Sequence, residues 1–150
     1  MKRTFAALAG LVTTLGLVLV GGQASAATPE QPRIEVSIQS QSIVYDLYDS
    51  AGNHLGIGKF NADPADGVPG DAIQACDRFA DGWGIETQLD VNPGSNWDTD
   101  RSVNTRGHSS PYCSGWDSGN LGEDTPVAIR VCLVKSGNSP ICSPGVRGSA

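Results

Sequence analysis

The segment TRGHSSPYCSGWDSGN, residues 105–120, concentrates side chains that could do chemistry. A Ser–His–Asp triad needs a nucleophile within hydrogen-bond reach of a base that a carboxylate orients. His108 is followed directly by Ser109 and Ser110, but neighbours along a strand point to opposite faces, and GHSSP lacks the second glycine of a G-x-S-x-G turn. A Cys–His pair would need a free thiolate, whereas we expect Cys113 to be oxidised. We therefore predict no catalytic residue and no enzyme activity.

Acidic residues raise two further possibilities. Glycosidase chemistry requires two carboxyl groups at a set separation across a cleft, and a chain of this size has little room for one. The stretch NWDTDR places Asn96, Asp98 and Asp100 at alternate positions, as at the start of an EF-hand loop. Arg101 stands where that loop needs glycine, and no Glu closes it at the twelfth position. We predict no metal ligand and no cofactor, with a degenerate surface calcium site as the alternative to an Asx-turn loop.

Aromatic residues in segments with strong turn composition predict binding rather than catalysis. A loop tryptophan buries a large amphipathic area when it meets a sugar ring or a partner protein, although it can also fold back over an open sheet end. Trp83 instead belongs to an alternating strand pattern that predicts an inward-facing, structural side chain. Because SSPYCSGWDSGN combines turn residues with a cysteine that can fix it, we predict a rigid display loop, which lowers the entropic cost of binding. The predicted partner-binding residues are Trp97, His108, Tyr112 and Trp116, with Pro29 and Pro32 of the N-terminal tail.

Four cysteines, an even number, predict two disulfides in an exported chain. They contain no C-x-x-C pair, and neither histidine lies at a zinc-finger interval, so a zinc site is the weaker alternative. Cys132 and Cys142 flank LVKSGNSPI, whose centre has turn composition. A hairpin centred near Gly137 would place them on adjacent strands, which predicts Cys132–Cys142 and leaves Cys76–Cys113.

The N-terminal segment 1–26 has the pattern of a secretory signal peptide. Lys2 and Arg3 precede an apolar run, and Ala24-Ser25-Ala26 supplies small residues for cleavage. A retained membrane anchor is the alternative, but four glycines interrupt the run. The following segment 27–33, ATPEQPR, predicts a flexible tail. We therefore expect a secreted, extracellular protein.

The charge of the mature chain limits its partners. Cleavage removes Lys2 and Arg3 from the ten basic residues, which leaves eight against sixteen acidic ones, a net charge of −8. Such a chain is repelled by phosphate backbones and by anionic lipid. We expect neither nucleic acid nor a membrane surface as a partner.

Apolar residues alternate with polar ones in most segments between residues 34 and 150. Strand patterns cover residues 34–38, 43–48, 55–58, 83–91, 102–105, 127–134 and 141–146, separated by turns rich in Gly, Pro, Asn and Asp. AIQACDRFA, residues 72–80, fits either a strand or a single helical turn. The pattern predicts an all-β fold: one small antiparallel β-sandwich of the immunoglobulin or fibronectin III kind, with seven to eight strands and two disulfides.

Several short stretches resemble the small exported proteins of actinobacteria. These are TRGHSSPY, W-x-SGNL at residues 116–121, VAIRVCLVK and the closing ICSP, which together span about the last fifty residues. The small adaptor subunit of umbrella toxin particles is among the proteins of this description. The resemblance implies an adaptor that joins a lectin-like subunit to a large toxin chain through its N-terminal part.

These observations together predict a secreted, non-catalytic binding or adaptor protein. Its expected partner is another extracellular protein, within an extracellular complex such as a toxin particle. The alternatives are a secreted protease inhibitor, which would insert a cysteine-held loop into an active site, and a carbohydrate-binding module that uses Trp97 and Trp116.

Overall fold

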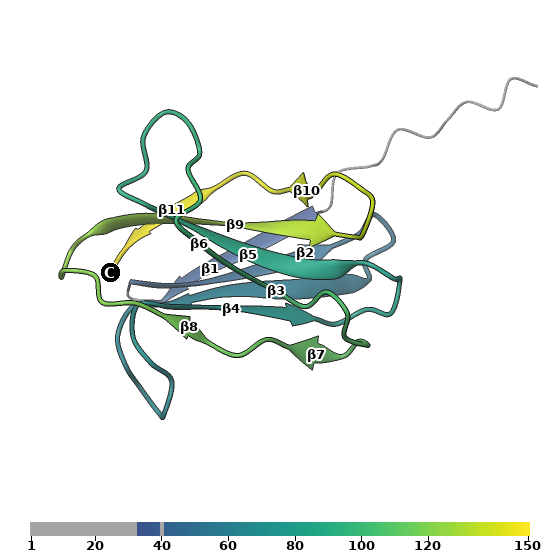
Figure 1. The fold of residues 1–150 in the computed structure, drawn as a ribbon, viewed down its shortest axis with the longest axis horizontal. Helices are drawn as coiled ribbons and strands as arrows, with labels where there is room; N and C mark the ends of the chain where they lie inside the picture. Colours follow the sequence, from purple (N-terminus) through teal and green to yellow (C-terminus); the bar gives the residue numbers. More distant parts are fainter. Residues whose placement is uncertain (1–32, 40) are drawn as a thin grey trace, which may run out of the picture.

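The computed structural model describes residues 33–39 and 41–150 and is built entirely from β-strands within that part (Figure 1). Two antiparallel sheets pack face to face, which confirms the predicted all-β, two-layer architecture. No helix in the described residues has the length and apolar character needed to cross a membrane. The predicted signal peptide, the tail up to residue 32, and Pro29 and Pro32 lie outside the described residues.

The first sheet, called sheet 1, runs in the order β1-β2-β3-β4-β7, with β8 also paired to β4. Its strands are β1 (Arg33–Gln39), β2 (Ser42–Tyr48), β3 (His54–Asn61), β4 (Ala72–Asp77), β7 (Tyr112–Cys113) and β8 (Asp117–Ser118). The ambiguous segment 72–80 thus forms a strand over its first six residues. β1 begins at Arg33, the last residue of the predicted tail.

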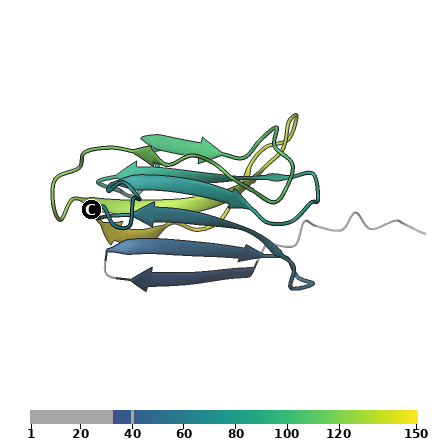
Figure 2. The ribbon, with the colours of Figure 1, turned by 90° about the horizontal axis from the view of Figure 1, so that it is seen from below.

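The second sheet, sheet 2, runs in the order β10-β9-β5-β6, with β11 also paired to β9. Its strands are β5 (Gly84–Val91), β6 (Arg101–Asn104), β9 (Pro126–Val134), β10 (Ile141–Cys142) and β11 (Val146–Ser149). The predicted last strand, 141–146, is instead two short strands that pair with different parts of β9. Figure 2 shows the two layers from the side.

The core lies between the sheets and follows the alternation of the sequence. Ile43, Tyr45 and Leu47 of β2 are buried, as are the inward residues of β5 and β9. Gly58 lets the layers approach closely, because a Cβ there would collide with Val131 and lie 2.8 Å from Thr87 Oγ1. The burial of these apolar side chains is the main stabilising contribution.

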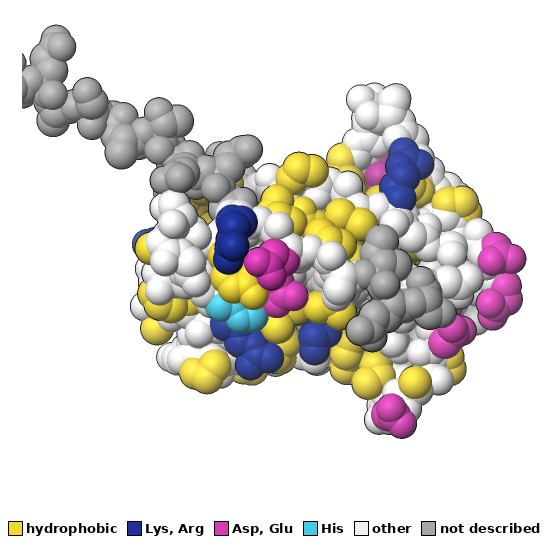
Figure 3. All heavy atoms as spheres, turned by 180° about the vertical axis from the view of Figure 1, so that it is seen from behind, with side chains coloured by type: hydrophobic (Ala, Val, Ile, Leu, Met, Phe, Trp, Pro, Cys, Tyr) yellow, Lys and Arg dark blue, Asp and Glu magenta, His cyan; other side chains and the backbone are white. Residues whose placement is uncertain are grey.

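The loops gather at two ends that differ in charge. The acidic end is formed by loops 62–71, 92–100 and 119–125, which carry seven carboxylates and neither lysine nor arginine: Asp63, Asp66, Asp71, Asp98, Asp100, Glu123 and Asp124. The basic end is formed by loops 49–53, 78–83, 105–111 and 135–140 and carries three cations, Arg78, Arg106 and Lys135, against two carboxylates, Asp49 and Asp81. Figure 3 shows Asp and Glu side chains gathered at the acidic end on one face of the molecule.

Candidate functional site

A hollow of about 530 Å³ opens at the basic end of the sandwich. Its walls come from the ends of β4, β5 and β9 and from loops 78–83, 105–111 and 135–136. The side chains that line it include Phe79, Trp83, Arg106, His108, Ser110 and Lys135. Aromatic rings and cationic groups therefore meet in one concave surface, which is the usual form of a binding site.

Trp83 lies in this hollow, so the prediction that it points into the core is wrong. It directly precedes β5, and it is half-buried rather than part of the core. The turn before it reorients the chain: Gly82 has a positive φ of 79°, and Asp81 Oδ1 accepts a 2.8 Å hydrogen bond from the Trp83 N–H. The Lys135 ammonium lies 5.5 Å from the centre of the Trp83 ring, a cation–π contact.

Phe79 supplies a second aromatic surface to the hollow. The residue is 38% exposed, which makes it one of the two large apolar residues most open to solvent in the described chain. The carboxylate of the buried Asp77 accepts a 3.1 Å hydrogen bond from the Phe79 N–H and so fixes the start of the loop. An apolar ring held at the surface by a buried polar group favours a recognition role.

Loop 105–111 forms the opposite wall and is anchored to β5 at its first residue. The buried Thr105 donates its N–H to the Ile85 carbonyl at 2.9 Å and accepts the Ile85 N–H on Oγ1 at 2.9 Å. Arg106 reaches back to Glu86, with Nη2 2.9 Å from Oε2. Ser110 Oγ is buried and has no hydrogen-bond partner within the described part of the chain.

His108 and Tyr112 stack on each other at the edge of the hollow. Their ring centres are 3.8 Å apart, and the ring planes differ by only 7°. The structure therefore brings together two of the predicted partner-binding residues. The stacking fixes both rings without enclosing His108, which remains exposed.

The segment that follows His108 lies along the sheet edge and does not form the predicted display loop. Around Ser114 the chain stays on β4: the Ser114 N–H donates to the Ala75 carbonyl at 2.8 Å, and Ser114 Oγ accepts the Ala75 N–H at 3.1 Å. Gln74 Nε2 donates to the Ser114 carbonyl at 3.0 Å. In the segment between β7 and β8, side-chain hydroxyl and amide groups thus hold the chain to β4 in place of regular strand pairing. The alternation of apolar and polar residues does not predict this arrangement. Trp116 beyond it lies over sheet 1, with Lys59 Nζ 5.9 Å from its ring centre.

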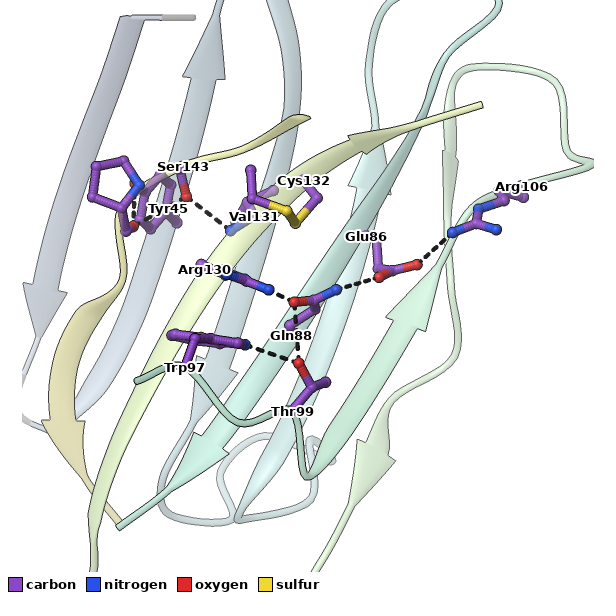
Figure 4. Close-up of a disulfide and its surroundings, with 12 residues drawn as sticks. Tyr45, Glu86, Gln88, Trp97, Thr99, Arg106, Arg130, Val131, Cys132 and Ser143 are labelled. Atoms are coloured by element: carbon purple, nitrogen blue, oxygen red, sulfur yellow. Dashed lines mark hydrogen bonds and ion pairs between the residues drawn. A yellow bond between two sulfur atoms is a disulfide. The ribbon is translucent and has the colours of Figure 1, made fainter. Parts of the chain in front are cut away.

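Trp97 lies far from the hollow, against the outer face of sheet 2 (Figure 4). Its Nε1 donates to Thr99 Oγ1 at 2.8 Å, and the Arg130 guanidinium lies 4.4 Å from the ring centre. Gly145 packs against the same indole, since a Cβ there would lie 2.8 Å from Cζ3. Trp97 is therefore half-buried, with a cation and a glycine against its ring, and it lines a second, smaller hollow of about 300 Å³.

A chain of polar groups lies beneath Trp97 on the outer face of β5. Arg130 Nε donates to Gln88 Oε1 at 2.8 Å, and Gln88 Nε2 donates to Glu86 Oε1 at 2.6 Å. Burial lowers the pKa of Arg130, whereas attraction to Glu86 and Asp90 opposes that change. Both residues of the Gln88–Glu86 pair are buried, and each is satisfied by a partner. The network explains why β5 carries polar residues that are nevertheless covered.

In the possible calcium loop, the Asp100 carboxylate and the Asp98 backbone take part in structural hydrogen bonds. Asp100 Oδ2 accepts the Val91 N–H at 2.7 Å, and the Asp98 N–H donates to Asp90 Oδ2 at 3.1 Å. Within residues 33–39 and 41–150, no cluster of three or more His, Cys, Asp or Glu side chains could hold a metal ion. The loop is stabilised by side-chain capping of its own backbone.

Both predicted disulfides are present, Cys76–Cys113 and Cys132–Cys142. Each joins residues directly opposite one another on neighbouring antiparallel strands. Both also lie at the basic end, beside the hollow: Cys76 precedes Asp77, and Cys132 lies two residues before Val134. Two disulfides are consistent with an oxidising, extracellular environment.

The four predicted binding residues that the structure describes occupy three separate places. His108 and Tyr112 lie at the hollow, Trp116 over sheet 1 and Trp97 over sheet 2. Sequence reasoning missed Phe79 and Lys135. The turn composition of RFADGW, residues 78–83, was the signal that could have placed Trp83 and Phe79 in a loop.

Comparison with models of known protein families, with curated proteins and with solved structures finds no match.

Proposed function

We propose that this chain is a secreted, non-catalytic binding protein of the adaptor type, which holds another extracellular protein at its basic end. The observation that carries the proposal is the pair of disulfides beside an aromatic hollow. Covalent cross-links placed there restrict the walls of the hollow before a partner arrives. Preorganisation of this kind lowers the entropic cost of association.

The side chains of the hollow support a protein partner. Binding hot spots are enriched in aromatic residues and arginine and are surrounded by groups that exclude water. Phe79, Trp83 and Arg106 supply these types, and the stacked His108–Tyr112 pair extends the surface. Glycan binding is the second candidate, because an open indole with hydroxyl groups nearby also suits a sugar ring.

The resemblance to small exported actinobacterial proteins adds the idea of a complex with several subunits, such as a toxin particle. In such a complex, the predicted tail with Pro29 and Pro32 would contact one subunit and the hollow another. β1 begins at Arg33, opposite Tyr48, at the same end of the sandwich as the hollow.

A capture experiment tests the proposed function. The tagged mature protein, residues 27–150, is incubated with culture medium of its own source, and retained proteins are identified by mass spectrometry. We expect one partner, retained by the wild type and reduced about tenfold by Trp83→Ala, because loss of an aromatic anchor typically costs 1–3 kcal/mol or more. Trp116→Ala is the matched control, since this tryptophan lies over sheet 1.

Two outcomes would contradict the proposal. A wild-type protein that retains no partner at low or high salt would exclude the adaptor role. Equal loss of the partner with Trp83→Ala and Trp116→Ala would remove the hollow as the site. Retention of a polysaccharide instead, with the same dependence on Trp83, would favour the glycan candidate.

A further inference from the structure

The hollow has an ordered arrangement of charge that follows from the strand order of sheet 2. β5 lies between β9 and β6. Trp83 directly precedes β5, Lys135 directly follows β9, and Arg106 lies two residues after β6. Neighbouring strands are about 4.8 Å apart, so the indole lies between two basic residues whose main chains are about 10 Å apart.

The two cations differ in how fully they are neutralised. Arg106 is paired with Glu86, and its side chain remains 45% exposed. Lys135 has no carboxylate within ion-pair distance in the described part of the chain and rests over Trp83. The remaining charged group in the lining, Asp77, is buried beneath the loop and caps its backbone.

The surroundings of the hollow increase its preference for negative charge. The mature chain carries a net charge of −8, and its opposite end bears seven carboxylates with no lysine or arginine in the same loops. The loops of the basic end carry three cations against two carboxylates, Asp49 and Asp81, so their net charge is positive while that of the other end is negative. An anionic group is therefore repelled by most of the molecule and drawn to the cations of the basic end. Such a field orients an approaching partner and raises its rate of association.

From this arrangement, and resting on the proposed function, we propose that the hollow binds an extended segment of the partner protein in which an apolar side chain stands between two carboxylates. Alternate residues of an extended chain share one face and lie about 6.6 Å apart. A segment of the form acid-x-apolar-x-acid places its apolar side chain on Trp83 and Phe79. Its two carboxylates then reach Lys135 on one side and Arg106 on the other.

The test uses defined peptides and the oxidised mature protein, residues 27–150, labelled with ¹⁵N. The first probe is the capped pentapeptide Asp-Ser-Leu-Ser-Asp; the matched controls are Asn-Ser-Leu-Ser-Asn and Lys-Ser-Leu-Ser-Lys. We expect saturable shifts of the Trp83 indole N–H and of the amides of Arg106 and Lys135 with the acidic peptide. Its affinity should fall about tenfold from 20 mM to 500 mM salt, because exposed charges are screened.

Variants separate the local charge from the net charge. Lys135→Glu should weaken the acidic peptide about tenfold or more, whereas Lys59→Glu, which makes the same change of net charge beside Trp116, should leave its affinity within about twofold. Unchanged disulfide content and far-UV circular dichroism establish that both variants are folded. Equal weakening by the two variants would overturn the proposal.

Three further results would also overturn it: no saturable shift with the acidic peptide, an equal response to the lysine peptide, or a response of Trp83 to an oligogalacturonate but not to the peptide. The last would identify the ligand as an acidic sugar. The outcomes are distinct from those of the capture experiment. Capture that depends on Trp83 without peptide binding leaves the proposed function standing and removes this inference. Peptide binding without any captured partner removes the adaptor role and leaves only the preference of the hollow for acidic segments.

Discussion

Trp97 owes its position to a neighbour that has no side chain. The indole lies between the Arg130 guanidinium and Gly145, and φ at this glycine does not lie in the left-handed region. We predict that Gly145→Ala lowers the free energy of unfolding by about 1–3 kcal/mol, because the added methyl group would lie 2.8 Å from Trp97 Cζ3 and must displace the ring. Urea denaturation followed by tryptophan fluorescence measures the change.

Gly94→Ala is the matched control for this steric argument. Gly94 belongs to the same region of the surface, but an added Cβ would meet no atom within 4 Å. Its variant should unfold within about 0.5 kcal/mol of the wild type. Equal destabilisation by both substitutions would show that backbone freedom, and not contact with Trp97, determines the choice of glycine.

The buried phenol of Tyr45 should make the free energy of unfolding depend on pH in the alkaline range. Burial raises the pKa of its phenol above the ordinary value of 10.0, and a hydrogen bond with Ser143 opposes this change. The unfolded chain therefore loses this proton first, so the stability that the neutral phenol contributes is complete below pH 10 and is lost as pH rises through the folded pKa. The free energy of unfolding should decline above pH 10 less steeply in Tyr45→Phe than in the wild type.

At neutral pH the same substitution should cost about 1 kcal/mol, because Tyr45 OH donates a 3.0 Å hydrogen bond to the Pro144 carbonyl. The Pro144 carbonyl still has a hydrogen-bond donor in this variant, because Ser143 Oγ also donates to it. Tyr112→Phe is the control: it removes a tyrosine hydroxyl from the edge strand β7 and leaves the buried Tyr45 phenol in place. Identical alkaline slopes in the wild type and Tyr45→Phe would contradict the argument.

At the scale of elements, the two disulfides should contribute unequally to stability. Cys76–Cys113 closes a separation of 37 residues and Cys132–Cys142 a separation of 10. On the chain-entropy model, removing the first costs about 4 kcal/mol and removing the second about 3 kcal/mol. Urea denaturation of the two double-alanine variants tests this order. A larger loss for the variant without Cys132–Cys142 would mean that the cross-link acts mainly through native contacts of the 135–140 loop.

How much of these elements the sequence predicts depends on how regular their pairing is. β2, β5 and β9 alternate over seven or more residues and face a single core, so their patterns predict them directly. The Cys132–Cys142 pairing follows from the turn composition around Gly137, whose φ is 77°. Regular alternation and turn chemistry are local properties of a chain, and sequence analysis detects them well.

The candidate site is less predictable, because it depends on contacts between distant segments. β7 and β8 have two residues each and are held to β4 by Ser114 and Gln74, which no periodicity marks. Trp83 stands at the boundary between a turn and a strand, where alternation assigns it to the core by extending the strand by one residue. Its neighbour Lys135 is 52 positions away and reaches it only through the pairing of β5 with β9.

Across the whole molecule, the few basic residues contact aromatic rings more often than carboxylates. Four of the eight lysine and arginine residues in the described part of the chain lie over aromatic rings, and each of the three tryptophans has one of these cations near its ring. Only two, Arg33 and Arg106, form ion pairs with carboxylates in the described residues. Most of the fifteen acidic side chains in residues 33–150 are therefore not neutralised by an ion pair, and their repulsion acts on the fold as a whole.

This repulsion should be measurable at the acidic end. Asp63, Asp66 and Glu123 are exposed, and each lies in a loop without lysine or arginine. We predict that the triple variant Asp63→Asn, Asp66→Asn, Glu123→Gln gains about 0.5–1 kcal/mol in free energy of unfolding at 10 mM salt, because like charges within the Debye length repel one another. Asn suits position 66, where φ is 51°, since this residue tolerates the left-handed region.

The dependence on salt and on binding separates this explanation from local effects of the substitutions. In 1 M salt the Debye length falls to about 3 Å, so the gain should vanish. Capture of the partner should be retained, because the hollow lies at the opposite end of the sandwich. A gain that persists in 1 M salt would point to loop conformation instead of charge. We predict that the carboxylates of the acidic end repel anionic segments and so direct them to the basic end. Loss of capture by the triple variant would contradict this prediction, because it would place the binding surface at the acidic end.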